Sequence, residues 1–237
     1  MSEVLEKAAS RCKVAHLFRL QDYCLLCTSK ECQKADWPFH KKSCKSNQES
    51  ALVAKRQDEA VMAIRRLTGM HLEKPLPSQI LQELPVFLRH FRPQVCAAGY
   101  HCLGIKRKDP QAWQHSIFQL RIERLPNPPP NAKPWSYYKI SDAMAVPIRM
   151  LVDIWGEEFG PELQDMLKQG DIYHKENVKE GCVGTITTFL VCNSDGHDRR
   201  VISWAGHDPE GWGDAGKDWF GDLVRAVEEG CGRLPSK

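Results

Sequence analysis

The stretch Val183-Gly-Thr-Ile-Thr-Thr-Phe-Leu-Val-Cys192, followed by Asn193-Ser-Asp-Gly-His-Asp198 and by Arg200-Val-Ile-Ser-Trp-Ala205, decides the fold of most of this chain. Its outer segments are rich in β-branched and aromatic residues, which favour strands. The middle segment contains an Asp-Gly pair, which is typical of tight hairpin turns. The stretch therefore predicts two antiparallel strands joined by a short turn.

A further strand is expected upstream, in residues 116–125. Phe118, Leu120 and Ile122 alternate there with polar residues, as in a strand with one buried face. The strand should end at Pro126, where a proline-rich segment begins that cannot pair in a sheet. We interpret this segment, which runs to Pro134, as an exposed connector, and the alternative is a ligand for another domain.

Other segments place apolar residues at helical spacing. We expect a linker helix that ends near Gly69, two or three short helices between Ile80 and Val95 interrupted by Pro85 and Pro93, a helix from Pro147 to Trp155 capped by Ser141-Asp142, a helix from Pro161 to Lys168, and a last helix around Trp219 to Val227. This order predicts an α+β domain with a small, mostly antiparallel sheet flanked by helices.

The N-terminal part contains a dense cluster of cysteine and histidine. It reads Cys24-Leu-Leu-Cys27-Thr-Ser-Lys-Glu-Cys32-Gln-Lys-Ala-Asp36-Trp-Pro-Phe-His40-Lys-Lys-Ser-Cys44. Thiolate and imidazole are the ligands of tetrahedral structural zinc, and C-x2-C and H-x3-C are usual ligand spacings. One zinc site can therefore be formed by Cys24, Cys27, His40 and Cys44. The alternative is a small apolar core of free thiols.

The expected local helix supports this site. Asp36 can cap a helix in which Trp37 and Pro38 form the first turn, so that His40 and Cys44 lie on one face. Ser29 can likewise cap a short helix that brings Cys32 toward the same centre.

The segments Tyr23-Cys24 and Ser29 to Cys44 resemble the C-terminal half of a MYND-type zinc finger, in a fungal-type protein with an uncharacterised C-terminal domain. Complete fingers of this family carry eight ligands around two interleaved zinc ions. The resemblance assigns Cys12 to the fourth ligand and Cys32, His40 and Cys44 to the last three, while the first three are missing from this sequence. The fifth is ambiguous, because four residues separate Cys27 from Cys32 where the family has three.

The segment from His16 to Leu26 is longer than the family spacer, so it is an insertion or an error in the gene model. We expect one bound Zn²⁺ in a rearranged site, with Cys12, Cys24, Cys27, Cys32, His40 and Cys44 as the candidate ligands. The resulting division is a partial finger in residues 1–48, a linker helix in 49–75 and an α+β domain in 76–237.

The resemblance implies a protein-interaction module rather than an enzyme. Its partner would be a protein or a proline-containing peptide, received near Gln33 and Trp37. One alternative is the remnant of a SET-and-MYND-type lysine methyltransferase, but the Asn-His-Ser-Cys-like cofactor block of that class is absent from the sequence. A nucleic-acid-binding regulator is disfavoured by a net charge of only +3 and a pI near 8.3.

The sequence contains neither a membrane-spanning apolar run nor a signal peptide, so we expect an intracellular protein, nuclear or cytoplasmic.

The five remaining cysteines are expected to be reduced core thiols; they are Cys96, Cys102, Cys182, Cys192 and Cys231. Two weaker clusters could form metal or acid–base sites, but we expect both to be structural. They are His90 and His101 with Cys96 and Cys102, and Asp195, His197 and Asp198 with His207 and Asp208. Familiar nucleotide-binding and hydrolase motifs are absent.

Overall fold

The computed structural model describes residues 51–69, 74–105, 108–128, 131–194, 197–207 and 218–230, with the backbone alone for 154–163, 194 and 197. Residues 51–68 form a helix. The elements that follow are α3 (Pro77–His90), α4 (Arg92–Cys102), α5 (Ala112–His115), β1 (Ser116–Arg124), the 3-10 helix η2 (Pro134–Tyr137), β2 (Tyr138–Pro147), α6 (Ile148–Lys179), β3 (Gly184–Ser194), β4 (His197–His207) and α7 (Trp219–Glu228).

The strands form one mixed sheet in the order β2-β1-β3-β4. β1 pairs antiparallel with β2, and β3 pairs antiparallel with β4, as the hairpin sequence predicted. The central pairing of β1 with β3 is parallel. It arises because α6 crosses over from the edge strand β2 and returns the chain beside β1. The class is therefore α+β, with two antiparallel pairings and one parallel pairing.

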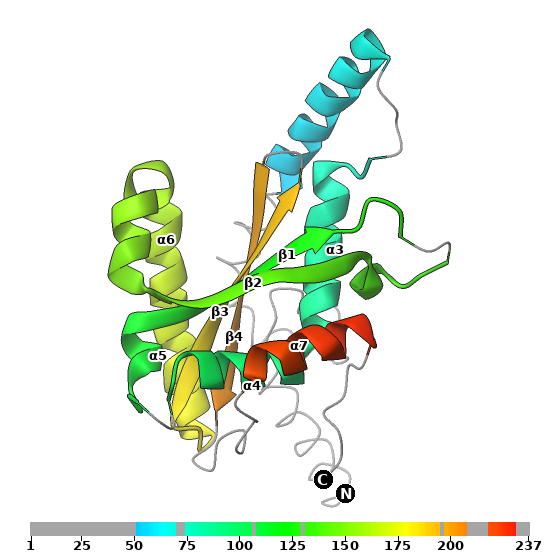
Figure 1. The fold of residues 1–237 in the computed structure, drawn as a ribbon. Coiled ribbons are helices and arrows are strands. Elements are labelled where there is room, and N and C mark those ends of the chain that lie inside the picture. The colour runs from blue at the N-terminus through cyan, green and yellow to red at the C-terminus, as the bar shows by residue number, and fades with distance from the viewer. Residues whose placement is uncertain are drawn as a thin grey trace, which may run out of the picture.

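Helices cover both faces of the sheet, as Figure 1 shows. On one face, α3, α4 and α7 pack over the larger core, which includes Phe87, Phe118 and Leu190, all fully buried. On the other face, α6 packs over a smaller core that includes Phe189 and Trp204. The even-numbered residues of β1 face the first core and Ile117 faces the second, so the alternation seen in the sequence has a direct structural counterpart.

Strand β2 was not expected from the sequence. Ser141 and Asp142, predicted to cap a helix, lie instead inside this strand. Ile122 pairs with Ile140 while Arg121 pairs with Asp142, so one extra residue is accommodated by a bulge. The bulge breaks the two-residue period of the strand, which is why alternation did not reveal it. Pro147, placed at the start of the predicted helix, is the N-cap of α6.

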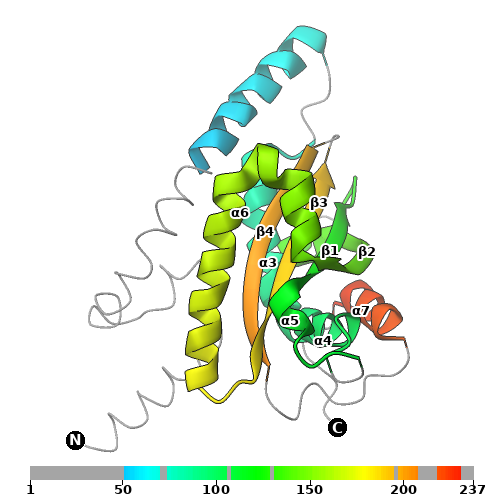
Figure 2. The ribbon, with the colours of Figure 1, turned by 90° about the vertical axis from the view of Figure 1, so that its left-hand side faces the viewer.

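Two helix predictions also need correction. Pro85 was expected to interrupt a helix but lies inside α3, which continues for 14 residues. The fully buried side chains of Leu84 and Phe87 beside it provide the packing that offsets one lost backbone hydrogen bond. The two short helices expected over 147–168 are a single element, α6, of 32 residues. Figure 2 shows that α6 turns back sharply part-way along its length.

The short helices α5 and η2 were not expected from the sequence, whereas α4, α7 and the helix of residues 51–68 agree with it. Pro93 lies in the first turn of α4, where its missing N–H is tolerated, and α7 begins at Trp219, with Asp218 as its cap. The helix of residues 51–68 ends at Gly69, whose φ of +63° is the left-handed conformation that glycine adopts readily. No helix among the described residues is long and apolar enough to cross a membrane.

Candidate functional site

The predicted zinc ligands all precede residue 51. Cys12, Cys24, Cys27, Cys32, His40 and Cys44 therefore lie outside the described residues. Within the described ranges, no group of three or more His, Cys, Asp or Glu residues is arranged to hold a metal ion.

The histidines and cysteines of α3 and α4 have structural roles. The ring of His90 stacks on Trp135, with centroids 4.0 Å apart and an interplanar angle of 6°. Its Nε2 lies 3.2 Å from the carbonyl oxygen of Gly230. Cys96 is buried, and this burial raises the pKa of its thiol. These residues therefore belong to the core and its edges, as expected.

The hairpin does not assemble an acid–base centre from its described residues. Asp198 lies near the start of β4, where it accepts a hydrogen bond from Asn193 Nδ2 at 3.0 Å. His207 is the last residue of the same strand and packs near Tyr100 and Trp113. Nine residues of extended chain place these two side chains about 30 Å apart. Asp195 and Asp208 lie outside the described residues.

The described cysteines are free thiols. Cys96 and Cys192 are buried, as predicted, while Cys102 and Cys182 are half-buried. Burial raises the pKa of both Cys102 and Cys192 to about 11. A thiol with this pKa is protonated and a poor nucleophile near neutral pH. Cys231 lies outside the described residues.

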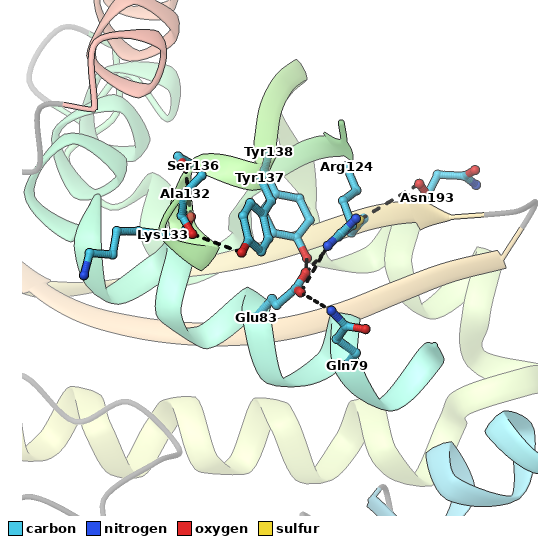
Figure 3. Close-up of polar contacts among 10 residues, drawn as sticks. Gln79, Glu83, Arg124, Ala132, Lys133, Ser136, Tyr137, Tyr138 and Asn193 are labelled. Carbon is cyan, nitrogen blue, oxygen red and sulfur yellow. Dashed lines mark hydrogen bonds and ion pairs between the residues drawn. The ribbon is translucent and has the colours of Figure 1, made fainter. Parts of the chain in front are cut away.

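The most developed polar cluster surrounds Glu83 of α3, which is only 6% exposed (Figure 3). Arg124, the last residue of β1, donates from Nε to Glu83 Oε2 at 2.9 Å and from Nη2 to Oε1 at 3.3 Å. The hydroxyl of Tyr138 donates to Oε2 at 2.6 Å, and Gln79 Nε2 donates to Oε1 at 2.9 Å. We call these four residues the Glu83 cluster.

The pKa shifts within this cluster agree with its hydrogen bonds, because they keep Tyr138 protonated and Arg124 charged. Burial, followed by the hydrogen bond and charge of Glu83, raises the pKa of Tyr138 well above its ordinary value, so the phenol remains a donor. Burial lowers the pKa of Arg124, but the hydrogen bonds and charge of Glu83 outweigh it and raise that pKa overall. Arg124 also lies over the ring of Tyr137 at 5.0 Å.

Each carboxylate oxygen of Glu83 accepts two hydrogen bonds. Because this uses the usual acceptor capacity of a carboxylate, the group has none left for a substrate proton or a ligand. The cluster joins α3 to the ends of β1 and β2 instead, and we assign it a structural role.

A sequence signal for this cluster exists but was not recognised. Arg124 continues the inward-facing positions Phe118, Leu120 and Ile122, so its side chain points toward the core face. Glu83 lies beside Leu84 within an apolar helical stripe. A buried acid and a buried base in the same domain predict an ion pair.

Ser116, His115 and Asp109 form a second polar group, at the surface. His115 Nε2 lies 2.8 Å from Asp109 Oδ2, and Nδ1 lies 3.2 Å from Ser116 Oγ. Although these residue types match a hydrolytic triad, the His115 and Asp109 side chains are 63% and 43% exposed. The backbone N–H of Gln111 also donates to Asp109, and this bond lowers the pKa of the carboxyl group. These contacts stabilise the turn that precedes β1. The group is open to solvent, whereas catalytic sites usually exclude water.

The helix of residues 51–68 carries the clearest candidate for an interaction surface. Its inner side contacts the domain: Asp58 accepts a hydrogen bond from the Ser78 backbone N–H at 3.0 Å, and Arg65 donates to the Lys74 carbonyl at 2.8 Å. Its outer side bears large apolar residues that are more than half exposed, namely Leu52, Val53, Ile64 and Leu67. Exposed apolar side chains gathered on one helix can contribute to a binding surface.

Neither a family model, nor a curated protein, nor a solved structure matches this chain. We therefore infer function from the residues themselves.

Proposed function

We propose that the chain is a zinc-binding protein whose N-terminal MYND-type segment recruits a partner protein through a proline-containing peptide. The observation that carries this proposal is the spacing of Cys24, Cys27, Cys32, His40 and Cys44 within 21 residues. Zinc would hold the short segment in a single fold, and its binding energy would be folding energy. The zinc would be structural and not catalytic.

The described domain supports a scaffold role beside this module. Its most buried charged group, the Glu83 cluster, is saturated by internal hydrogen bonds. Its buried thiols Cys96 and Cys192 have raised pKa values, which disfavours nucleophilic chemistry by them.

Native mass spectrometry of the full chain tests the metal. We expect one zinc ion, and its loss in Cys44→Ser and in His40→Ala. The matched controls Cys102→Ser and His115→Ala remove the same residue types from the described domain and should retain the ion. Two ions would overturn the incomplete-finger model, and none would favour free thiols.

Binding to an array of proline-rich peptides tests recruitment. We expect one or more peptides to bind the zinc-loaded chain, and binding to fall at least tenfold in Trp37→Ala without loss of zinc. The control Trp219→Phe alters an indole of the described domain and should leave binding unchanged. The recruitment proposal fails if no peptide binds, or if Trp37→Ala binds as well as the parent chain.

A further inference from the structure

One face of the helix of residues 51–68 carries apolar residues near both of its ends, with Arg56 and Gln57 between Val53 and Ala60. Val53, Ala60, Ile64 and Leu67 follow one another at intervals of seven, four and three residues, which places them on one side of a helix. We call these four residues the apolar stripe. Val53 is 53% exposed, Ile64 57% and Leu67 87%. Figures 1 and 2 show this helix, in blue to cyan, extending beyond the end of the sheet.

The stripe is not the face that anchors the helix to the domain. Anchoring uses Ala54, Asp58 and Arg65, which lie on another side; Ala54 is 2% exposed and Arg65 7%. The helix thus has two faces with different uses, one packed on the domain and one apolar face that no described element covers.

The size of the stripe limits what can cover it. A fully buried Val, Ile or Leu side chain removes on the order of 100 Å² from water, so the stripe offers about 200 Å². Pairing with a second copy would bury about twice this area, well below the roughly 1,200 Å² of stable free interfaces. A tethered segment needs far less area, because tethering gives an effective concentration on the order of millimolar.

Such a segment is present immediately before the helix. Residues 16–26 read His-Leu-Phe-Arg-Leu-Gln-Asp-Tyr-Cys-Leu-Leu, in which Leu17, Phe18, Leu20, Tyr23, Leu25 and Leu26 are apolar or aromatic. Residues 16–22 have no counterpart in the zinc-finger pattern, whereas Tyr23 and Cys24 at the end of the segment belong to the proposed finger. The stripe spans about 21 Å, and the 26 residues between Leu26 and Val53 can reach any point on it.

We propose that the apolar segment of residues 16–26 docks on the apolar stripe of the same chain and so fixes the N-terminal module against the domain. The contact is a small, intramolecular one that a competing ligand can displace. It goes beyond the recruitment function and does not depend on it, because the apolar segment needs cover whether or not zinc binds.

Photo-crosslinking in the full chain tests this contact. A benzophenone amino acid replaces Ile64 in one variant and Leu67 in another, and the adducts are mapped by peptide mass spectrometry. We expect adducts of monomer mass within residues 16–26. The control position is Lys55, exposed but off the stripe, which should give at least fivefold less of this adduct. Adducts of dimer mass, adducts elsewhere in the chain, or equal yield at the control position would overturn the proposal.

A second set of variants tests the segment itself. With the crosslinker at position 64, Phe18→Asp combined with Leu20→Asp should lower the adduct yield at least fivefold. The matched control, Val4→Asp combined with Leu5→Asp, introduces the same two charges outside the segment and should leave the yield unchanged. Unchanged yield in the double variant would also overturn the contact. Zinc content, measured on the same samples, separates this outcome from a failure of the zinc proposal.

Discussion

Substitution of Glu83 by Gln is the most informative perturbation of the described domain. The change preserves the size of the side chain and removes its charge. One of its two oxygen atoms becomes an NH₂ group, which must then face donors: Arg124 and Gln79 on one side, or Arg124 and Tyr138 on the other. Either orientation leaves at least one buried donor without an acceptor and Arg124 without its counter-ion.

The structure sets the expected magnitude. The side chains of Glu83 and Arg124 are only 7% and 11% exposed, so water screens the pair weakly. Breaking a buried ion pair by removing one partner costs about 3–5 kcal/mol. Because Gln retains part of the hydrogen bonding, we expect the lower end, about 3 kcal/mol. In a domain of this size, this corresponds to a fall in melting temperature of roughly 6–12 °C.

A combined variant separates loss of the pair from loss of a partner. Glu83→Leu with Arg124→Met and Tyr138→Phe removes both charges and the phenol hydroxyl, and leaves apolar groups of similar size. Since a well-packed apolar replacement of a buried pair is often neutral, we expect this triple variant to lie within about 1 kcal/mol of the parent.

Urea unfolding at pH 7, followed by far-UV circular dichroism, measures both variants from midpoints and slopes. The reasoning would be refuted if Glu83→Gln cost less than about 1 kcal/mol, or if the triple variant were as unstable as the single one. The first result would mean that Arg124 finds water or another acceptor. The second would mean that the cluster contributes specific net stability.

Two further predictions concern buried groups. Burial raises the pKa of Cys192 from 9.0 to about 11, so the unfolded chain loses this proton first as pH rises; stability is complete below about pH 9 and declines toward pH 11. Urea unfolding from pH 8 to 10.5 should show a shallower alkaline decline in Cys192→Ala than in the parent, and equal declines would contradict this assignment. A Cβ on Gly184 would lie 2.5 Å from Trp113 Cε2 and 2.6 Å from His207 Nε2, so Gly184→Ala should cost about 1–3 kcal/mol in the same assay. Gly170→Ala, with its nearest contact at 3.1 Å, should cost less, and the reverse order would show that Trp113 moves aside freely.

Alternation and turn chemistry made much of the sheet predictable. The hairpin of β3 and β4 follows from its β-branched and aromatic residues and from the Asp-Gly turn between them, and strand β1 follows from the side-chain period of two. Strand β2 has no such period: its partners are Ile140 for Ile122 and Ala143 for Leu120, an interval of three residues across the bulge. A search for strict alternation of apolar and polar residues therefore does not detect strand β2.

The parallel pairing of β1 with β3 was not predictable, because no local signal encodes it. It depends on where α6 returns the chain, and Pro161 was expected to begin a second helix inside what is one long crossover element. The same limitation applies to the Glu83 cluster. Its members come from positions 79, 83, 124 and 138, and only the tertiary fold brings the two oppositely charged positions together.

The anchoring contacts of the domain and the proposed contact of the N-terminal segment both use the helix of residues 51–68. The anchoring contacts of Asp58 and Arg65 hold this helix to the domain, while the apolar stripe is free to hold the N-terminal segment. If a partner peptide and residues 16–26 use overlapping surfaces, occupancy of one must weaken the other by the same factor in both directions. Addition of the best-binding proline-rich peptide should then reduce the crosslink at position 64, and the crosslinked chain should bind that peptide correspondingly less well. Independence of the two measurements would show that docking and recruitment are separate properties of the chain.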